Sequence, residues 1–280
     1  MSEATIDLAV EPTITTRKEK PKFRKTLRNE VSGLGFAEGI ASAIKIHGGQ
    51  IERILNDTTQ DTINHKPVIL LVTHNYQAEV WAALGGLPDP KLGKNFREVR
   101  QIAQAAPEGS WLNQHTFPLY NVDEKSKKLR QKVSRAIQPR ETIENTQATI
   151  KNFQSLMQAA KYVANDGLVI MCPEGTRDKN DKWQTGVAAL IKAAKSKLGD
   201  KDGYIIMADV SGIDLRNWIK DKASKYIPSL SPFSKTKVRY SDPIPLSEID
   251  TSQGVDGVTI TQQVENKYRD WKSTTSNPTP

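Results

Sequence analysis

A histidine and a glutamate five residues apart follow the first strongly apolar stretch of the chain. The run Val68-Ile69-Leu70-Leu71-Val72 ends two residues before His74, and Glu79 comes five residues after that histidine. An ideal helix turns ~100° per residue, so this spacing does not align two side chains on one helix face. We therefore expect His74 in the turn after a strand and Glu79 in the first turns of the next helix. There the carboxylate can bond one imidazole nitrogen and leave the other to act as a general base, although a lone histidine after a strand is more often structural.

A second apolar run, Leu168-Val169-Ile170-Met171-Cys172, leads into Pro173-Glu174-Gly175-Thr176-Arg177. Proline ends the strand, Gly175 permits an unusual backbone angle, and the guanidinium of Arg177 offers a planar fork of donors that suits phosphate. The alternative is an ordinary strand-to-loop turn with a surface arginine, in which Glu174 caps or orders the loop. The two motifs lie about a hundred residues apart and look like two halves of one active site, a base with its carboxylate and an anion site.

Neither apolar run alternates with polar residues, which is typical of strands buried on both faces of a parallel or mixed sheet. Strand-length runs and helical patterns follow each other along the chain. This alternation predicts a single α/β domain with a mixed, largely parallel sheet flanked by helices, plus an N-terminal helical arm. The predicted strands span residues 67–73, 116–120, 168–172, 204–210 and 237–240. The predicted helices span residues 77–84, 96–105, 142–165, 187–198, 215–225 and 258–271.

Four segments are expected along the chain. Residues 1–19 lack apolar periodicity and are predicted to be a disordered tail. Residues 20–58 are predicted to be a basic helical arm, with two short helices separated at Gly48-Gly49, and residues 59–272 to be the main domain. Residues 273–280, rich in Thr and Pro, are predicted to be a loose tail. The arm can lie on an anionic membrane or pack on the domain, because a basic flank beside an apolar face is common to both.

The composition restricts the kinds of protein that the chain can be. Its 280 residues carry a net charge of +8 and have a mean hydropathy of −0.55. No stretch approaches the ~20 continuous apolar residues of a membrane span, and the chain shows no signal-peptide pattern. The single cysteine, Cys172, excludes an internal disulfide, and the four histidines lack metal-ligand spacing. We therefore expect a cytoplasmic protein without a bound metal.

The positive charge favours an anionic partner. A second basic run at residues 124–140 adds to the first one in the arm. No nucleic-acid-binding motif is present, so we expect no nucleic acid partner. A basic surface that meets only solvent is the alternative to a specific anionic partner.

The histidine–x4–acid box and the later Pro-Glu-Gly-Thr-Arg element together resemble the glycerolipid (lysophosphatidic acid/glycerol-3-phosphate) acyltransferase family. The later segments come in a similar order. Gln184-Thr185-Gly186 with the helix after it resembles the family's lysine/glycine turn and helix, and residues 205–212 resemble its next strand. The resemblance covers residues 60–245.

The resemblance implies an O-acyltransferase that moves a fatty acyl group from an acyl thioester to a hydroxyl of a glycerophosphate or lysophospholipid acceptor. His74 would be the general base, and Glu79 would stand where the family's aspartate orients that histidine. Acyl-CoA or acyl carrier protein (acyl-ACP) would bring the acyl group as a co-substrate, so the resemblance implies neither a cofactor nor a metal. The phosphate of the acceptor would be held by Glu174, Gly175, Thr176 and Arg177.

The sequence departs from the family pattern at several positions. Thr73 replaces the usual asparagine before the histidine, Glu79 replaces the usual aspartate, and Ala208-Asp209 replaces a proline-valine pair. The block that normally supplies an arginine or lysine for the phosphate matches best at residues 116–123, which contain neither. Lys125 or a neighbour is the candidate substitute. A non-phosphate acceptor therefore stays open.

A non-catalytic relative that binds lipid or acyl carrier protein on the same scaffold is the alternative to the enzyme. Retention of His74, Glu79 and the whole Pro-Glu-Gly-Thr-Arg element favours the enzyme. The expected partners are the glycerophosphate or lysophospholipid acceptor, an anionic membrane surface and acyl carrier protein, whose acidity suits the second basic run. The protein is expected to be cytoplasmic and peripherally associated with the membrane, in phospholipid synthesis or remodelling.

Overall fold

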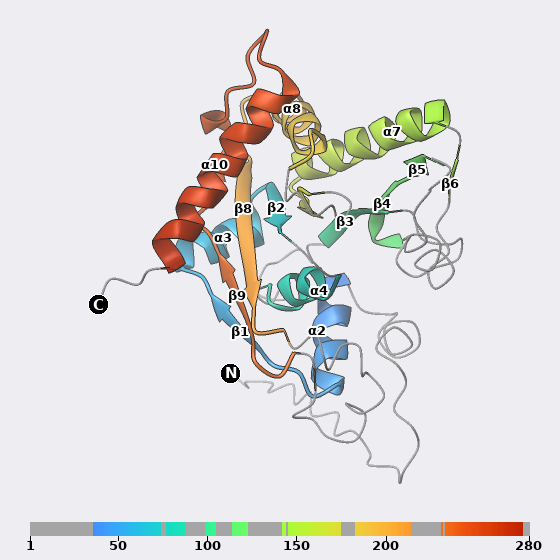
Figure 1. The fold of residues 1–280 in the computed structure, drawn as a ribbon. Helices are drawn as coiled ribbons and strands as arrows, with labels where there is room; N and C mark the ends of the chain where they lie inside the picture. Colours follow the sequence, from blue (N-terminus) through green and yellow to red (C-terminus); the bar gives the residue numbers. More distant parts are fainter. Residues whose placement is uncertain are drawn as a thin grey trace, which may run out of the picture.

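The computed structural model describes residues 36–73, 77–87, 99–104, 114–122, 142–143, 145–174, 183–213, 231 and 233–276. Within these ranges the chain forms an eight-stranded mixed sheet with helices on both faces (Figure 1). Its strands are Ile51–Ile54 (β1), Val68–Val72 (β2), Val99–Gln104 (β3), Thr116–Leu119 (β4), Leu168–Met171 (β7), Tyr204–Ser211 (β8), Thr236–Tyr240 (β9) and Ile244–Pro245 (β10). Seven of them follow the order β1-β9-β8-β2-β7-β3-β4 across the sheet, and β10 pairs with β8.

The sheet is largely parallel, as expected. β8, β2, β7, β3 and β4 run parallel to one another, whereas β9 runs antiparallel to β8 and β1 runs parallel to β9. Two further short strands, Asn121–Val122 (β5) and Thr142–Ile143 (β6), pair with each other in parallel outside this sheet. The carboxyl ends of the five parallel strands therefore share one edge, and ligands of α/β proteins usually bind at that edge.

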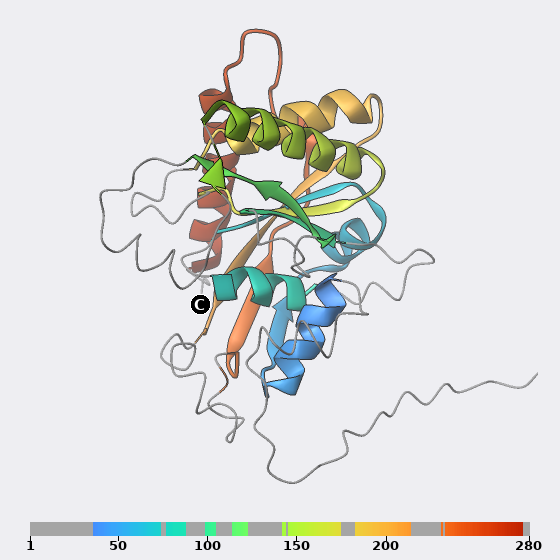
Figure 2. The same cartoon turned by 90° about the vertical axis from the view of Figure 1, so that its right-hand side faces the viewer.

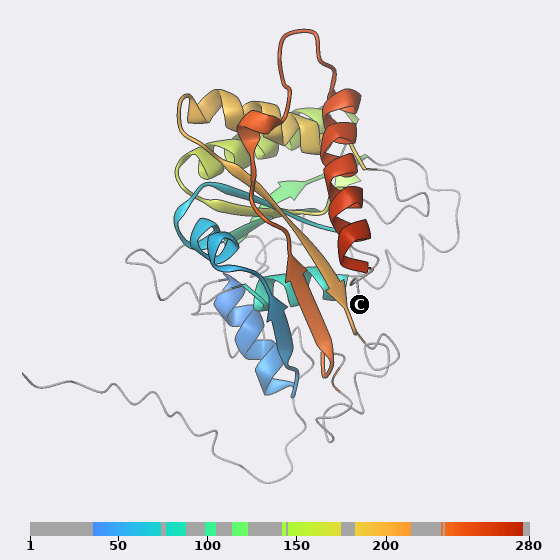
Figure 3. The ribbon, with the colours of Figure 1, turned by 90° about the vertical axis from the view of Figure 1, so that its left-hand side faces the viewer.

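Helices cover both faces of the sheet. The helices are Phe36–Ile46 (α2), Asp57–His65 (α3), Gln77–Gly85 (α4), Asn145–Ala164 (α7), Gly186–Leu198 (α8) and Gly257–Ser276 (α10), with a 3-10 turn at Leu246–Glu248 (η3). The sheet lies between the pair α2 and α4 on one side and the pair α7 and α8 on the other (Figure 2). α10 packs against α8 and runs beside β8 (Figure 3).

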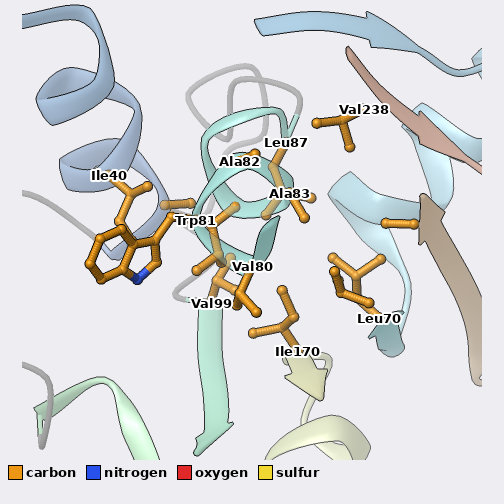
Figure 4. Close-up of a cluster of buried hydrophobic side chains, with 14 of the residues drawn as sticks. Ile40, Leu70, Val80, Trp81, Ala82, Ala83, Leu87, Val99, Ile170 and Val238 are labelled. Carbon is orange, nitrogen blue, oxygen red and sulfur yellow. The ribbon is translucent and has the colours of Figure 1, made fainter. Parts of the chain in front are cut away.

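The central strand β2 is buried on both faces. Successive side chains of a strand point to opposite faces, so Val68, Leu70 and Val72 enter one hydrophobic cluster while Ile69 and Leu71 enter another. In the first cluster, the side chains of β2 join others from α2, α4 and three further strands of the sheet (Figure 4): Ile40, Trp81, Val99, Ile170 and Val238. The unbroken apolar run of β2 thus reflects a strand covered by helices on both sides.

Most of the elements predicted from the sequence are confirmed. The strands expected at residues 67–73, 116–120, 168–172, 204–210 and 237–240 are β2, β4, β7, β8 and β9. The helices expected at residues 77–84, 142–165, 187–198 and 258–271 are α4, α7, α8 and α10.

The helix predicted over residues 96–105 is wrong, because Val99–Gln104 forms β3 between β7 and β4. Val99 and Ile102 are three residues apart, a spacing that also fits a helix, but in the strand they enter opposite hydrophobic clusters. The guanidinium of Arg100 lies over the rings of Phe117 (5.6 Å) and Tyr162 (5.0 Å), which accommodates its charge beside the core.

The second helix expected in the arm is also wrong. Ile51–Ile54 forms β1, which pairs with β9 at one side of the sheet, and α3 follows it. α3 begins after Asn56, whose side chain accepts a hydrogen bond from the Thr59 amide (2.7 Å). The first helix of the arm is found as α2, and its apolar face belongs to the hydrophobic core. The described part of the arm, residues 36–58, therefore packs on the domain.

The expected loose tail begins too early, because α10 continues to Ser276. Several further predictions lie outside the described residues: the tail at 1–19, the first part of the arm, the second basic run at 124–140 and the helix at 215–225.

Candidate active site

The strands that carry the two motifs are direct neighbours in the sheet. β2 pairs with β7 in parallel, with Leu71 opposite Met171. The chain therefore continues past β2 at Thr73 and past β7 at Pro173 along the same edge. The expected proximity of the two strand ends is found: Thr73, which precedes the first motif, and Pro173, which begins the second, lie at the carboxyl edge of the sheet.

Only part of each predicted motif belongs to the described residues. Glu79 and Glu174 belong to the described residues, and both are partly buried. The other predicted site residues lie outside the described ranges, and their roles stay predictions: His74, Lys125, Gly175, Thr176 and Arg177.

Glu79 lies in the first turn of α4 and is partly buried, as the spacing of the first motif predicts. Three residues separate Thr73 from Gln77, where α4 begins, and a chain of that length spans at most ~14 Å. The first turn of α4 is therefore tied closely to the end of β2. A carboxylate is also stabilised there by the positive end of the helix dipole.

α4 is held firmly against the sheet. Trp81 is fully buried in the first hydrophobic cluster (Figure 4). The buried hydroxyl of Tyr240, on β9, donates a hydrogen bond to the Ala83 carbonyl (2.7 Å). Burial raises the pKa of Tyr240 far above its ordinary value, so this hydroxyl stays protonated and remains a donor. The helix that carries Glu79 is thus packed by its apolar face and bonded to a neighbouring strand.

Glu174 is partly buried and follows the buried Pro173 directly after β7. One of its carboxylate oxygens is shielded from solvent. The amide of Gln184 donates a hydrogen bond to the Pro173 carbonyl (2.8 Å). The loop that carries the rest of the second motif therefore leaves and returns at one point of the sheet edge. α8 begins two residues after Gln184, so the positive end of its dipole lies at the same edge.

A hydrogen-bonded chain of side chains borders the end of β2. The Thr73 and Tyr268 hydroxyl oxygens are 2.8 Å apart. The ammonium of Lys272 donates to the Tyr268 hydroxyl (3.2 Å) and lies 3.2 Å from a carboxylate oxygen of Asp209. Because Val72 pairs with Ala208, Asp209 follows on β8 beside Thr73. These hydrogen-bonded side chains thus join α10 to the ends of two parallel strands.

The charge of Lys272 is stabilised by this arrangement. Partial burial acts to lower the pKa of Lys272, but its interactions with Tyr268 and Asp209 together raise it more, so the net pKa lies above the ordinary value of 10.5. Lys272 is therefore a cation at all physiological pH values, and Asp209 compensates its charge.

The sequence did not predict this group of side chains. Tyr268 lies 195 residues from Thr73, and no local pattern encodes a contact of that range. One signal was present, because Asp209 replaces a valine of the family pattern. A carboxylate in a partly buried strand position requires a cation or donors nearby, and Lys272 meets that requirement.

Two further properties concern ligands and membranes. Among the described residues, no group of three or more His, Cys, Asp or Glu side chains gathers to bind a metal ion. No helix in the described part of the chain combines the length and apolar character needed to cross a bilayer.

Comparisons with known proteins add little to this description. No family model matches the chain, and no curated protein matches its sequence. A solved structure with some similarity is the 1-acyl-sn-glycerophosphate (LPA) acyltransferase PlsC from Thermotoga maritima, with a TM-score of 0.44 and 14% sequence identity. The similarity covers 91% of this chain and 82% of that chain. A TM-score below 0.5 does not establish a common fold, so the function is inferred below from the residues of this chain.

Proposed function

We propose that the protein is an O-acyltransferase that transfers a fatty acyl group from acyl-CoA or acyl-ACP to a hydroxyl of a glycerophosphate or lysophospholipid. The direct parallel pairing of β2 with β7 is the observation that supports this proposal most. It brings the strand end that precedes His74 next to the start of the Pro-Glu-Gly-Thr-Arg loop. A base and an anion site at one edge are what an acyl transfer to a phosphate-bearing acceptor requires.

The proposed reaction needs one base and correct positioning. His74 takes the proton of the acceptor hydroxyl while the hydroxyl oxygen attacks the thioester carbonyl carbon. A carbon–oxygen bond forms, the carbon–sulfur bond breaks, and the proton passes to the departing thiolate. Glu79, in the first turn of α4, holds the imidazole in the required tautomer and stabilises its charged form.

The loop after β7 suits an acceptor with a phosphate group. Its ends are joined by the hydrogen bond between Gln184 and Pro173, and α8 directs its positive end to the same edge. Arg177 in this loop supplies a guanidinium, which can bind phosphate through two parallel hydrogen bonds. We therefore assign the phosphate of the acceptor to this loop rather than to the end of β2.

The cellular setting is part of the proposal. A glycerolipid acceptor lies at a membrane surface, and the seven Lys and Arg residues between positions 17 and 28 would attract anionic lipid. The second basic run at residues 124–140 suits an acidic acyl carrier protein. We place the protein in the cytoplasm, bound peripherally to the membrane, in phospholipid synthesis or remodelling.

The decisive experiment measures thiol release from acyl-CoA and acyl-ACP with a panel of acceptors. The panel pairs glycerol-3-phosphate with glycerol, and lysophosphatidate with monoacylglycerol, so that each pair differs only in the phosphate. We expect turnover with at least one phosphate-bearing acceptor. His74→Ala should lower kcat by about 10²-fold or more, which is the usual contribution of a general base.

His65→Ala is the matched control for this experiment. His65 is exposed at the end of α3, before β2 begins, and therefore lies at the opposite edge of the sheet from the site. Its loss should leave kcat unchanged. Full activity of His74→Ala would contradict the mechanism. Absence of turnover with the whole panel would favour the non-catalytic protein that binds lipid or acyl carrier protein.

A further inference from the structure

α10 contacts both of the segments that form the proposed active site. Its Tyr268 hydroxyl is 2.8 Å from the Thr73 hydroxyl, one peptide bond before His74. The ring of the same Tyr268 packs against Trp183, with ring centroids 5.6 Å apart. Trp183 precedes Gln184, whose amide closes the second loop on Pro173. One side chain therefore touches the end of β2 and the returning end of the loop after β7.

Tyr268 is held in a single orientation. Only 8% of its surface is exposed, and its ring is enclosed by Trp183 and by Trp271, at 5.6 and 5.9 Å between centroids. The ammonium of Lys272 lies 5.6 Å from the centre of the same ring. A hydroxyl on a ring so enclosed has a defined position, which a surface tyrosine would not have.

The Tyr268 hydroxyl has a hydrogen-bond partner on each side. An ammonium group has donors only, so the phenolic oxygen accepts from Lys272 (3.2 Å). The single hydrogen of Tyr268 is then available for the Thr73 oxygen at 2.8 Å. Asp209 holds Lys272 at 3.2 Å on its other side. The contacts run from the Asp209–Lys272 ion pair through the Tyr268 hydroxyl to Thr73.

We propose that Tyr268 is a positioning residue of the active site and that Lys272 and Asp209 orient its hydroxyl. Tyr268 holds the side chain of Thr73 at the end of β2, and thereby restrains the residue from which the chain continues to His74. The expected loss of turnover rests on the proposed acyl transfer, whereas the expected effect on the surroundings of His74 does not. No substrate contact is assigned to Tyr268.

Removal of the hydroxyl alone tests the inference in the whole protein. Tyr268→Phe keeps the ring between the two tryptophans, so thermal unfolding should change little. We expect kcat for the preferred acceptor to fall about 10- to 100-fold, because small misplacements of a catalytic group reduce turnover by such factors, while KM for donor and acceptor stays the same. Tyr204→Phe, at the opposite end of β8, is the matched control and should have the kcat of the unmodified protein.

The partner of the hydrogen bond gives a second test. Thr73→Val removes the other hydroxyl at constant shape and should lower kcat to a similar extent. The double variant Thr73→Val with Tyr268→Phe should be no slower than either single variant, because both remove the same interaction. Thr73→Ser should restore most of the turnover lost in Thr73→Val. Additive losses, or a changed KM with unchanged kcat, would overturn the inference.

The histidine ring signals in nuclear magnetic resonance spectra test the inference without turnover. The chain has four histidines, so the ring signals of His74 can be assigned by their loss in His74→Ala. Tyr268→Phe should shift these signals and leave those of His65 in place, whereas Lys267→Met, on the outer part of α10, should shift neither. Unshifted His74 signals in Tyr268→Phe would refute the positioning role even if the acyl transfer is correct. Shifted signals in a protein without turnover would support the positioning role and contradict the proposed function.

Discussion

Glu79 is the described residue on which the proposed chemistry depends most directly. It lies in the first turn of α4, within a short chain distance of His74, and it is partly buried. The dipole of α4 favours the ionised form at that position, and an ionised carboxylate is the form that can accept a hydrogen bond from an imidazole. The proposed mechanism therefore assigns the orienting role to a carboxylate in the first turn of the helix that follows β2.

Two substitutions of Glu79 distinguish the effect of its charge on kcat from the effect of its side-chain length. Glu79→Gln keeps the shape but removes the charge, and should lower kcat on the order of 10²- to 10⁴-fold, because an amide does not stabilise the imidazolium. Glu79→Asp keeps the charge and shortens the side chain by one methylene, so it should lose much less. The measurement is thiol release at saturating donor and acceptor. Equal losses in both variants would indicate that packing, rather than charge, explains the need for Glu79.

α10 is the element that joins the two halves of the proposed site, and its first turn is well capped. The carboxylate of Asp256 accepts a hydrogen bond from the Thr259 amide (2.7 Å), three residues into the helix. Before the helix, Lys192 of α8 donates to the Val255 carbonyl. α10 therefore has a defined start, and its position along α8 determines where Tyr268 meets β2.

The cap of α10 should make the stability of the protein depend on pH. Hydrogen bonds from Thr259 lower the pKa of Asp256 below its ordinary value of 3.8. A lowered pKa means that the carboxylate stabilises the fold above pH 3.8 and loses this effect as the pH falls through its folded-state value. Asp256→Ala should therefore lower the melting temperature at pH 7, and its difference from the unmodified protein should shrink below about pH 4.

Two variants show whether the cap is responsible. Asp256→Asn keeps an acceptor without a charge, so its melting temperature at pH 7 should lie between those of Asp256→Ala and the unmodified protein. Asp270→Ala removes an exposed acid from the second half of α10, away from the cap, and should not lower the melting temperature. A difference for Asp256→Ala that stays constant from pH 7 to pH 3 would contradict the pH dependence.

The whole molecule combines a buried sheet with a strongly basic chain. Its core lies on both faces of the sheet, and α2, which the sequence assigned to the arm, is part of that core. The net charge of +8 is the balance of the whole chain, and its Lys and Arg residues gather in the two basic runs at residues 17–28 and 124–140. Because α2 is buried in the domain, any electrostatic attachment to lipid is better assigned to the residues that precede it.

Binding to anionic vesicles should depend on the basic run and on salt. Removal of residues 1–30 should abolish most of the sedimentation with vesicles that contain anionic lipid, since each Lys or Arg near such a surface contributes about 1 kcal/mol. Removal of residues 1–16 alone spares the basic run and should leave the sedimentation unchanged. High salt should weaken binding of the full chain through screening. Sedimentation that survives removal of residues 1–30 would place the membrane contact elsewhere.

The sequence by itself determined the helices and strands whose apolar residues recur with a regular spacing. The unbroken run of β2 predicted a strand covered on both faces, and the helical spacing in α7 and the glycine after α8 predicted those helices with nearly correct ends. It also predicted that Glu79 would lie in the first turns of the helix after β2. These properties follow from local periodicity and from breakers, which each segment carries within itself.

Beyond the expected proximity of the ends of β2 and β7, the tertiary structure alone decided which segments became neighbours. β1 and β3 are strands because β9 on one side and β7 and β4 on the other supply their hydrogen bonds, and this outweighs a local pattern that also fits a helix. The pairing of β2 with β7 and the contact of Tyr268 with Thr73 join residues far apart in the chain. Such partners are chosen by the packing of the whole core, and no single segment encodes that choice.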